Sequence, residues 1–249
     1  MRKLKAVFWD VDGTLADTEL YGHRLAFNQA FQALELGWDW DIPLYIELLK
    51  VQGGTRRIKY YADTNNISIN DELINLIHSR KQHFYQIIIT NGQVPLRIGV
   101  KRLVSELARN NINQWIVTTS SRIAINSLLK KHFELSYPFK GAITYEDVEE
   151  HKPSPDAYIK ALVQSKVSPL NCLAIEDSLP GLSSARKASI PCLITLTKWN
   201  TFSSTSMSEA KAIVNHLGER SDPTQIFQGS SCEEGYITLK YLENLLNIV

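Results

Sequence analysis

Residues 6–18 read AVFWDVDGTLADT, and this stretch sets the organisation of the chain. Its first part, AVFW, is short and wholly apolar, which is typical of a strand buried on both faces of a parallel sheet. The strand runs into Asp10 and Asp12, and residues two apart in an extended segment point the same way. Two carboxylates therefore project together from a strand end, where ligands bind in open α/β sheets. Gly13 lets the chain turn there and leaves backbone N–H groups facing the pair.

The paired carboxylates suit two kinds of chemistry. Asp10 can attack an electrophile and form a covalent intermediate, and Asp12 can pass a proton to the leaving group and recover one from water. The same pair offers oxygen ligands to a hard divalent cation such as Mg²⁺. Taken alone, however, a DxDG string is also compatible with an ordinary acidic turn, because Asp and Gly are common in turns.

Length and composition limit the class of protein. The chain has 249 residues, 44% of them hydrophobic, which suffices for one large domain or two smaller ones. Its net charge of +1 lacks the basic excess that binding to nucleic acid requires, and no segment approaches the length of a membrane span. Cys172, Cys192 and Cys232 lack metal-ligand spacing. We therefore expect a protein of a reducing cytoplasm with neither nucleic-acid nor membrane partners.

Alternating apolar patterns predict the rest of the fold. Buried strands are expected near residues 115–117, 142–143, 172–175, 192–196 and 213–214. Helices are expected from Pro95 to Leu107, around residues 125–129, around residues 158–162, just after Pro180 and at the C-terminus around residues 242–249. Strands that alternate with helices indicate an α/β fold, a doubly wound parallel sheet with helices on both faces. The polar residues 221–234 are predicted to form a mobile loop.

A long helical block interrupts this pattern. Between Asp12 and about Trp115 no clear strand appears, whereas apolar residues recur at helical spacing after the candidate N-cap Thr18. The block is too long for a crossover between strands. It is predicted to be a small α-helical domain, residues 18–92, inserted into a core of residues 1–17 and 93–249. An insertion at the catalytic end of a sheet is well placed to close over the site and exclude water.

Polar residues follow several of the predicted strands. Thr118 follows the second strand, Lys152 lies in a later loop, and Glu176 and Asp177 end another strand. Each alone is also explained as a helix cap or a solvated surface residue. Together they suit attack of a carboxylate on a phosphate monoester, because that reaction needs positive charge and hydrogen bonds around the non-bridging oxygens. We expect Mg²⁺ between Asp10 and Asp177, with Lys152 and the Thr118 hydroxyl at the phosphoryl group.

Four segments, in this order and spacing, match the motifs of a known family: DVDGT at 10–14, Thr118, HKPSPDAY at 151–158 and IEDSLPG at 175–181. The set resembles the haloacid dehalogenase-like hydrolase superfamily, whose core is Rossmann-like. The resemblance implies that Asp10 is the nucleophile and Asp12 the general acid/base. It also implies that Thr118, its neighbour Thr119, and Lys152 bind the phosphoryl group. The helical insertion resembles the small α-helical cap of this superfamily.

The same resemblance implies Mg²⁺ as the cofactor. Its ligands would be Asp10, the backbone carbonyl of Asp12 and Asp177, with Glu176 as a direct or indirect partner. Asp12 must be protonated when the leaving group departs, yet the pKa of an unperturbed Asp is about 3.9. Closure of the site or the bound substrate is therefore expected to raise the pKa of Asp12.

Within the superfamily the chain resembles the CbbY-type sugar-phosphate phosphatases nearly end to end. The matching segments are DTELYGHRLAFNQAF at 17–31, LLKVQGGTRRI at 48–58, VPLRIGV at 94–100, TTSSR at 118–122 and AIVNHLG at 212–218. The resemblance implies a link to the Calvin cycle, with the Rubisco inhibitor xylulose-1,5-bisphosphate as substrate. We expect a monomer in a bacterial cytoplasm, cyanobacterial in particular, although a plastid protein trimmed of its transit peptide would look the same.

Cations of the helical insertion are candidates for binding a second, non-reacting phosphate. Gly54 belongs to a glycine turn that delivers Arg56 and Arg57, and one of these two is expected to reach into the closed site. Each is alternatively a solvated loop residue. Further candidates for contact with substrate are His23, Arg24, Lys81 and Arg97. His23 alternatively has a purely structural role.

Other activities remain open at this point. β-Phosphoglucomutase resembles the chain in the same four motifs and the cap, but it returns the phosphoryl group to sugar instead of water. A dehalogenase is disfavoured because that chemistry does not use the second aspartate, Asp12. A phosphonatase is disfavoured because its Schiff-base lysine is not identified, with Lys50 as a candidate to test. From another class, a phospho-accepting signalling module also combines Asp, Thr and Lys with Mg²⁺. Such a module places its acidic metal pair on the first strand and its accepting Asp on a later one, has about half this length and lacks a cap.

Overall fold

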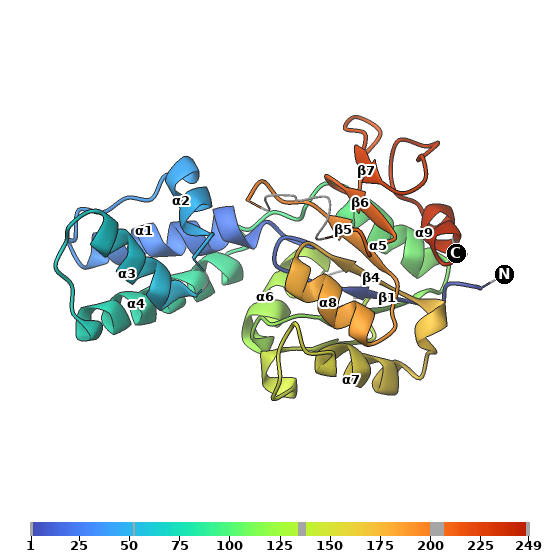
Figure 1. Ribbon diagram of the computed structural model, residues 1–249, viewed down its shortest axis with the longest axis horizontal. Coiled ribbons are helices and arrows are strands. Elements are labelled where there is room, and N and C mark those ends of the chain that lie inside the picture. Colours follow the sequence, from blue (N-terminus) through green and yellow to red (C-terminus); the bar gives the residue numbers. More distant parts are fainter. Residues whose placement is uncertain (1, 52, 134–137, 200–206, 248–249) are drawn as a thin grey trace. The chain divides into compact units, whose positions relative to one another are not determined.

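The structure is a computed structural model that describes residues 2–51, 53–133, 138–199 and 207–247. Contacts within the chain define two compact units. One unit comprises Met1–Ala16 and Leu96–Val249 and contains the sheet, and the other comprises Asp17–Pro95 and is helical (Figure 1). Among the described helices, none combines the length and the apolar character that are needed to cross a lipid bilayer.

The α/β unit is built on one seven-stranded sheet with the order β3-β2-β1-β4-β5-β6-β7. Its strands are β1 (Ala6–Trp9), β2 (Asn113–Val117), β3 (Gly141–Ile143), β4 (Cys172–Glu176), β5 (Cys192–Thr195), β6 (Ala212–Val214) and β7 (Ile226–Gln228). All neighbouring pairs are parallel except β6 and β7. The residues that follow β1, β2 and β4 therefore meet at one edge of the sheet. This arrangement confirms the predicted α/β class.

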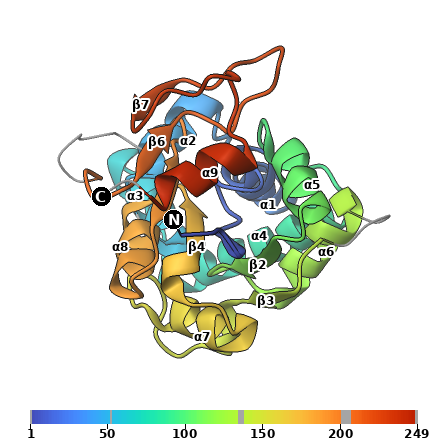
Figure 2. The same cartoon turned by 90° about the vertical axis from the view of Figure 1, so that its right-hand side faces the viewer.

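Helices cover both faces of the sheet because side chains alternate along each strand. The helices of this unit are α5 (Val100–Arg109), α6 (Arg122–Phe133), α7 (Asp156–Ser165), α8 (Leu179–Lys187) and α9 (Leu239–Leu245). On one face, the ring of Phe8 packs 6.2 Å from that of Tyr158 in α7. On the other, Trp9 Nε1 donates to Gln114 Oε1 at 3.1 Å, and Gln114 Nε2 donates to the Val104 carbonyl of α5 at 3.0 Å. Figure 2 shows α5 and α7 on opposite sides of the sheet.

The other unit consists of a π-helical turn, η1 (Glu19–His23), and four helices: α1 (Arg24–Ala33), α2 (Ile42–Leu48), α3 (Gly54–Thr64) and α4 (Asp71–Thr90). Side-chain caps begin two of them, since Asp41 and Asn70 each accept a backbone N–H bond at 2.9 Å. The interior is aromatic, with the ring of Phe27 4.6 Å from Trp40 and 5.9 Å from Phe31. Among its described residues this unit contains helices and no strand, as the sequence predicts.

Two details of the predicted fold are wrong. The expected mobile loop, residues 221–234, contains β7, which pairs antiparallel with β6. The helix that was expected to open at Pro95 begins at Val100, because Gly99, at φ +83°, first turns the chain. The predicted C-terminal helix is present as α9, which begins at Leu239, and Val249 of its apolar pattern lies outside the described residues.

Candidate active site

Asp10 lies at the carboxyl edge of the sheet, between the ends of two strands. It directly follows β1, and its backbone N–H donates to the carbonyl of Ile175 in β4 at 3.0 Å. Its side chain is buried. Thr118 follows β2 and is fixed in the same manner, since its backbone N–H donates to the carbonyl of Ile143 in β3 at 3.0 Å. The strand ladders therefore hold both residues at the edge predicted from the sequence.

Lys152 brings a buried positive charge to Asp10. It lies in the loop between β3 and α7, and its ammonium is 2.7 Å from Asp10 Oδ1 and 2.6 Å from Glu176 Oε1. It also donates to the Val117 carbonyl at 2.9 Å. Burial by itself lowers the pKa of Lys152, but the two carboxylates more than offset this and raise the pKa above its ordinary value. The ammonium therefore stays protonated beside Asp10.

Three carboxylates converge on the same point. Asp10, Glu176 and Asp177 each place an oxygen so that these three atoms lie within 4.8 Å of one another, and all three residues are buried. Burial, together with repulsion from neighbouring carboxylates, raises the pKa of Glu176 and that of Asp177. A set of oxygen ligands at this spacing fits a hard cation such as Mg²⁺, which would relieve the repulsion.

Two glycines make room for these carboxylates. A Cβ atom at Gly13, whose φ is +83°, would lie 2.3 Å from Asp177 Oδ2. A Cβ atom at Gly181, in the first turn of α8, would lie 1.9 Å from Glu176 Oε2. Among the described residues, Glu176 Oε2 is also a buried oxygen that has no hydrogen-bond partner. The backbone thus approaches the acidic side chains more closely than any other residue type would allow.

Asp12 is held by a side chain that the sequence reasoning missed. Ser120 Oγ donates a hydrogen bond to Asp12 Oδ2, and the Ser120 backbone N–H donates to Thr118 Oγ1 at 3.1 Å. Thr118 is buried, whereas Thr119 is exposed. Ser120 therefore links the predicted acid/base to the predicted phosphate-binding hydroxyl. The sequence signal that could have identified Ser120 is its position two residues after Thr118, in the turn before a helix.

Tyr158 is a second residue that the sequence reasoning did not assign. The fully buried hydroxyl donates to Glu176 Oε1 at 2.6 Å. Its ring also lies beneath the Lys152 ammonium, 5.6 Å from the ring centroid. The residue therefore supports two charged groups of the site at once. The sequence HKPSPDAY places Tyr158 close to Lys152, but an aromatic residue in a predicted helix is more simply interpreted as part of the hydrophobic core.

In the helical unit, His23 and Lys81 form a partly buried pair. Lys81 Nζ lies 2.8 Å from His23 Nδ1, and the imidazole stacks on Tyr85 with ring centroids 4.0 Å apart. Burial lowers the pKa of His23 well below its ordinary value, and the charges of Lys81 and Arg57 lower it further. A neutral imidazole can accept a hydrogen bond from an ammonium, so this pair carries one positive charge.

Several predicted substrate contacts have structural partners instead. Arg57 is buried and donates to the Leu48 carbonyl at 3.0 Å and to Tyr45 Oη at 3.2 Å. Arg24 donates to the carbonyls of Leu20 at 3.3 Å and Trp40 at 3.1 Å. Gly54 begins α3, and a Cβ there would lie 2.8 Å from His78 Cδ2 on α4. These partners belong to the interior of the helical unit.

The two remaining cations differ in their surroundings. Arg56 is exposed in the first turn of α3. Arg97 lies in the α/β unit, where its guanidinium donates to backbone carbonyls of that unit, including those of Leu196 at 2.6 Å and Asn215 at 2.9 Å. The guanidinium groups of Arg24, Arg57 and Arg97 thus bind oxygens of their own units, whereas the Arg56 side chain is exposed.

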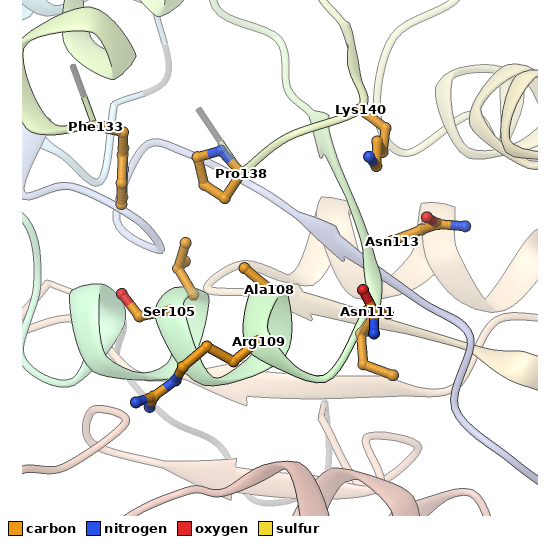
Figure 3. A pocket seen from close by; sticks show the side chains of 10 residues that line it. Ser105, Ala108, Arg109, Asn111, Asn113, Phe133, Pro138 and Lys140 are labelled. Carbon is orange, nitrogen blue, oxygen red and sulfur yellow. The ribbon is translucent and has the colours of Figure 1, made fainter. Parts of the chain in front are cut away.

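A surface cavity of about 560 Å³ lies at the opposite end of β2 from Thr118. Figure 3 shows Ala108 of α5 facing Phe133 and Pro138 across it. Its described lining includes none of the residues predicted for the site. The cavity is thus separate from the cluster of charged residues.

Known proteins resemble the chain over most of its length. The family model of the haloacid dehalogenase-like hydrolases matches residues 4–189. The plasmid CbbY protein of Cupriavidus necator is 36% identical over 229 residues, which cover 88% of this chain and 88% of that protein. CbbY of Rhodobacter capsulatus is 37% identical over 197 residues, 78% of this chain and 86% of that protein.

A solved structure agrees with these relatives. The crystal structure of a mutant of CbbY from Rhodobacter sphaeroides in complex with xylulose-1,5-bisphosphate is 32% identical and superimposes with a TM-score of 0.71. The match covers 87% of this chain and 96% of that chain. This chain therefore belongs to the haloacid dehalogenase-like hydrolases, and within that family it is a phosphatase of the CbbY type.

Proposed function

We propose that the protein is a Mg²⁺-dependent phosphatase that hydrolyses a small sugar phosphate through a phosphoaspartate on Asp10. The observation that carries this proposal is the buried contact of Lys152 with Asp10 at 2.7 Å. A phosphate monoester and a carboxylate are both anions, so attack by Asp10 requires a fixed positive charge at the point where they meet. The protonated Lys152 ammonium supplies that charge.

The reaction proceeds in two displacements. An oxygen of Asp10 forms a bond to phosphorus while the bond from phosphorus to the sugar oxygen breaks. Asp12 gives a proton to the departing sugar oxygen. A water molecule then attacks phosphorus, Asp12 takes a proton from that water, and the bond from phosphorus to Asp10 breaks. Phosphate leaves, and both carboxyl groups return to their starting states.

The other residues of the site hold these groups and the phosphoryl oxygens. Thr118 Oγ1 accepts a bond from the Ser120 N–H, so its own hydrogen can be donated to a phosphoryl oxygen. Thr119, which is exposed, offers a further hydroxyl or backbone N–H. Asp10, Asp177, Glu176 and the Asp12 carbonyl would hold Mg²⁺, which when bound supplies positive charge to the phosphoryl oxygens.

The substrate class that we propose is a sugar bisphosphate, and xylulose-1,5-bisphosphate is the best candidate. The complex of the Rhodobacter sphaeroides relative with this compound supports the choice. A second phosphate needs cations of its own, and Arg56 and Lys81 of the helical unit are proposed to supply them, with the neutral imidazole of His23 as the hydrogen-bond partner of Lys81. Arg56 is the only one of the three with an exposed side chain.

Phosphate release with Mg²⁺ from four compounds tests this function: xylulose-1,5-bisphosphate, ribulose-1,5-bisphosphate, β-glucose-1-phosphate and phosphoglycolate. We expect a strong preference for the first compound. Slow release from all four, with glucose-6-phosphate formed from β-glucose-1-phosphate, would instead make the protein a phosphosugar mutase. Lifetimes of minutes for the phosphoaspartate would point to a signalling module.

We further infer that residues 18–92 act as a cap that excludes water during the reaction. We also propose that the protein is a monomer and acts in a bacterial cytoplasm. Gel filtration combined with light scattering tests the first of these two properties. Fractionation of the source cells tests the second.

A further inference from the structure

Arg97 connects the ends of three strands through one guanidinium group. Its Nη1 donates to the Gly13 carbonyl, which follows β1, and to Thr195 Oγ1 at 2.8 Å at the end of β5. Its Nη2 donates to the Leu196 carbonyl at 2.6 Å and to the Asn215 carbonyl, just after β6, at 2.9 Å. The planar fork of an Arg side chain suits such a set of acceptors, and an ammonium could not reach them all.

The contact with Gly13 leads directly to the acidic cluster. Gly13 is packed so closely on Asp177 that a Cβ atom would lie 2.3 Å from Asp177 Oδ2. Its carbonyl is bound by Arg97, and its neighbour in the chain is Asp12. Gly13 therefore lies between Arg97 and Asp177. Because Asp12 directly precedes Gly13, the position of Gly13 sets the distance between the Asp12 backbone and Asp177.

The base of the Arg97 side chain is fixed as well, because the Arg97 backbone N–H donates to the Leu15 carbonyl at 2.9 Å. Both ends of the side chain are therefore held, so the guanidinium keeps Gly13 in place against Asp177.

We propose that Arg97 is a positioning residue of the active site, which fixes Gly13 against Asp177 and thereby strengthens Mg²⁺ binding without touching the substrate. This role rests on the Mg²⁺ dependence in the proposed function. It differs from the role predicted from the sequence, in which Arg97 binds a phosphate of the substrate. A positioning role predicts a lower kcat for every substrate with little change in KM. A phosphate-binding role predicts a higher KM for the bisphosphate alone.

The test uses Arg97→Met and Arg97→Lys, together with Arg102→Met as a matched control. Arg102 is also a partly buried arginine of the α/β unit that donates to backbone carbonyls, those of Leu217 and Gly218 at 3.0 Å. Isothermal titration calorimetry measures Mg²⁺ binding to each full-length variant in the absence of substrate. Steady-state kinetics give kcat and KM for p-nitrophenyl phosphate and for xylulose-1,5-bisphosphate at a fixed Mg²⁺ concentration near the wild-type Kd for Mg²⁺.

We expect Arg97→Met to raise the Kd for Mg²⁺ by about 10- to 100-fold, as loss of a group that orients metal ligands does. Arg97→Lys should raise the Kd by a smaller factor, because it keeps the charge but loses the forked hydrogen bonds. The kcat should fall by the same factor for both substrates, with each KM changed less than about twofold. Arg102→Met should lower the Tm and leave the Kd for Mg²⁺ unchanged.

A Kd for Mg²⁺ within about twofold of wild type in a folded Arg97 variant overturns the proposal, as does a KM that rises for the bisphosphate alone. If Arg97→Met fails to fold, Arg97→Lys decides the question by the same measurements. Failure of the wild-type protein to release phosphate from any sugar phosphate would refute the proposed substrate class. The calorimetry and p-nitrophenyl phosphate kinetics would still test Arg97.

Discussion

Replacing Lys152 with methionine should destabilise the α/β unit strongly, and more so at pH 8 than at pH 6. The Lys152 ammonium lies 2.7 Å from Asp10 and 2.6 Å from Glu176, and its side chain is only 6% exposed. Methionine has a similar volume, so the main loss is the charge. Removing one partner from a buried ion pair costs about 3–5 kcal/mol, because it leaves an uncompensated buried charge.

The pH dependence follows from the remaining carboxylates. Burial raises the pKa of Glu176, and the charge of Lys152 opposes that rise, so the pKa climbs further in the variant. A carboxyl group whose pKa is higher in the folded state than its unfolded value of about 4.3 binds protons more readily when folded. Stability therefore falls as the pH rises from that value to the folded-state pKa. At pH 6 a proton on Glu176 neutralises part of the buried negative charge that the Lys152 ammonium offsets in the wild-type protein.

Urea unfolding without Mg²⁺, followed by circular dichroism at pH 6 and pH 8, measures the free energy of unfolding. Arg186→Met is the control, because Arg186 forms an exposed ion pair with Glu209 and such pairs contribute about 0–1 kcal/mol. We expect a loss of about 3–5 kcal/mol for Lys152→Met at pH 8 and a smaller loss at pH 6. Equal losses at the two pH values, or a loss as small as that of the control, would refute the reasoning.

Three more outcomes test other parts of the site. Arg56→Ala should raise the KM for the bisphosphate far more than the KM for p-nitrophenyl phosphate, and equal effects on both would contradict the proposed contact. Lys59→Ala is the control, because it removes an ammonium that pairs with Asp63 at 2.6 Å, and it should change neither KM. Gly181→Ala should weaken Mg²⁺ binding about tenfold by calorimetry, because the added Cβ displaces Glu176. Mg²⁺ should raise the Tm more at pH 8 than at pH 6, because it competes with protons for Glu176 and Asp177, whose pKa values are raised. An equal rise at the two pH values would argue against Mg²⁺ binding at these carboxylates.

The central strands of the fold were predictable because their sequences are continuous apolar runs. β1 and β4 are buried along their whole length, and such runs occur in parallel sheets with helices on both faces. β7 was missed because it is an edge strand whose three residues include a half-buried Gln228 and an exposed Phe227, so neither alternation nor an apolar run marks it. Pairing with β6, which no local pattern encodes, makes it a strand.

The candidate site was predictable where its residues directly follow strands. Asp10 and Thr118 are examples, because parallel strands bring their carboxyl ends together whatever the details of the loops. The partners of Arg97 and Arg57 were not predictable. Most of them are backbone carbonyls, which carry no sequence signal, and they lie far along the chain or in another helix. For this reason the sequence does not distinguish an arginine that fixes a loop from one that binds phosphate.

The site is an arrangement of like charges that the backbone holds in place. Asp10, Glu176 and Asp177 bring oxygens within 4.8 Å, and the single ammonium of Lys152 pairs with two of these residues. In a buried site the repulsion is screened little by solvent, which is why burial and neighbouring carboxylates raise the pKa of both Glu176 and Asp177. A phosphate monoester adds further negative charge, so one ammonium cannot offset the whole set. The ladder between β1 and β4 imposes this crowding, and we expect a bound cation to relieve it and so to favour the binding of phosphate.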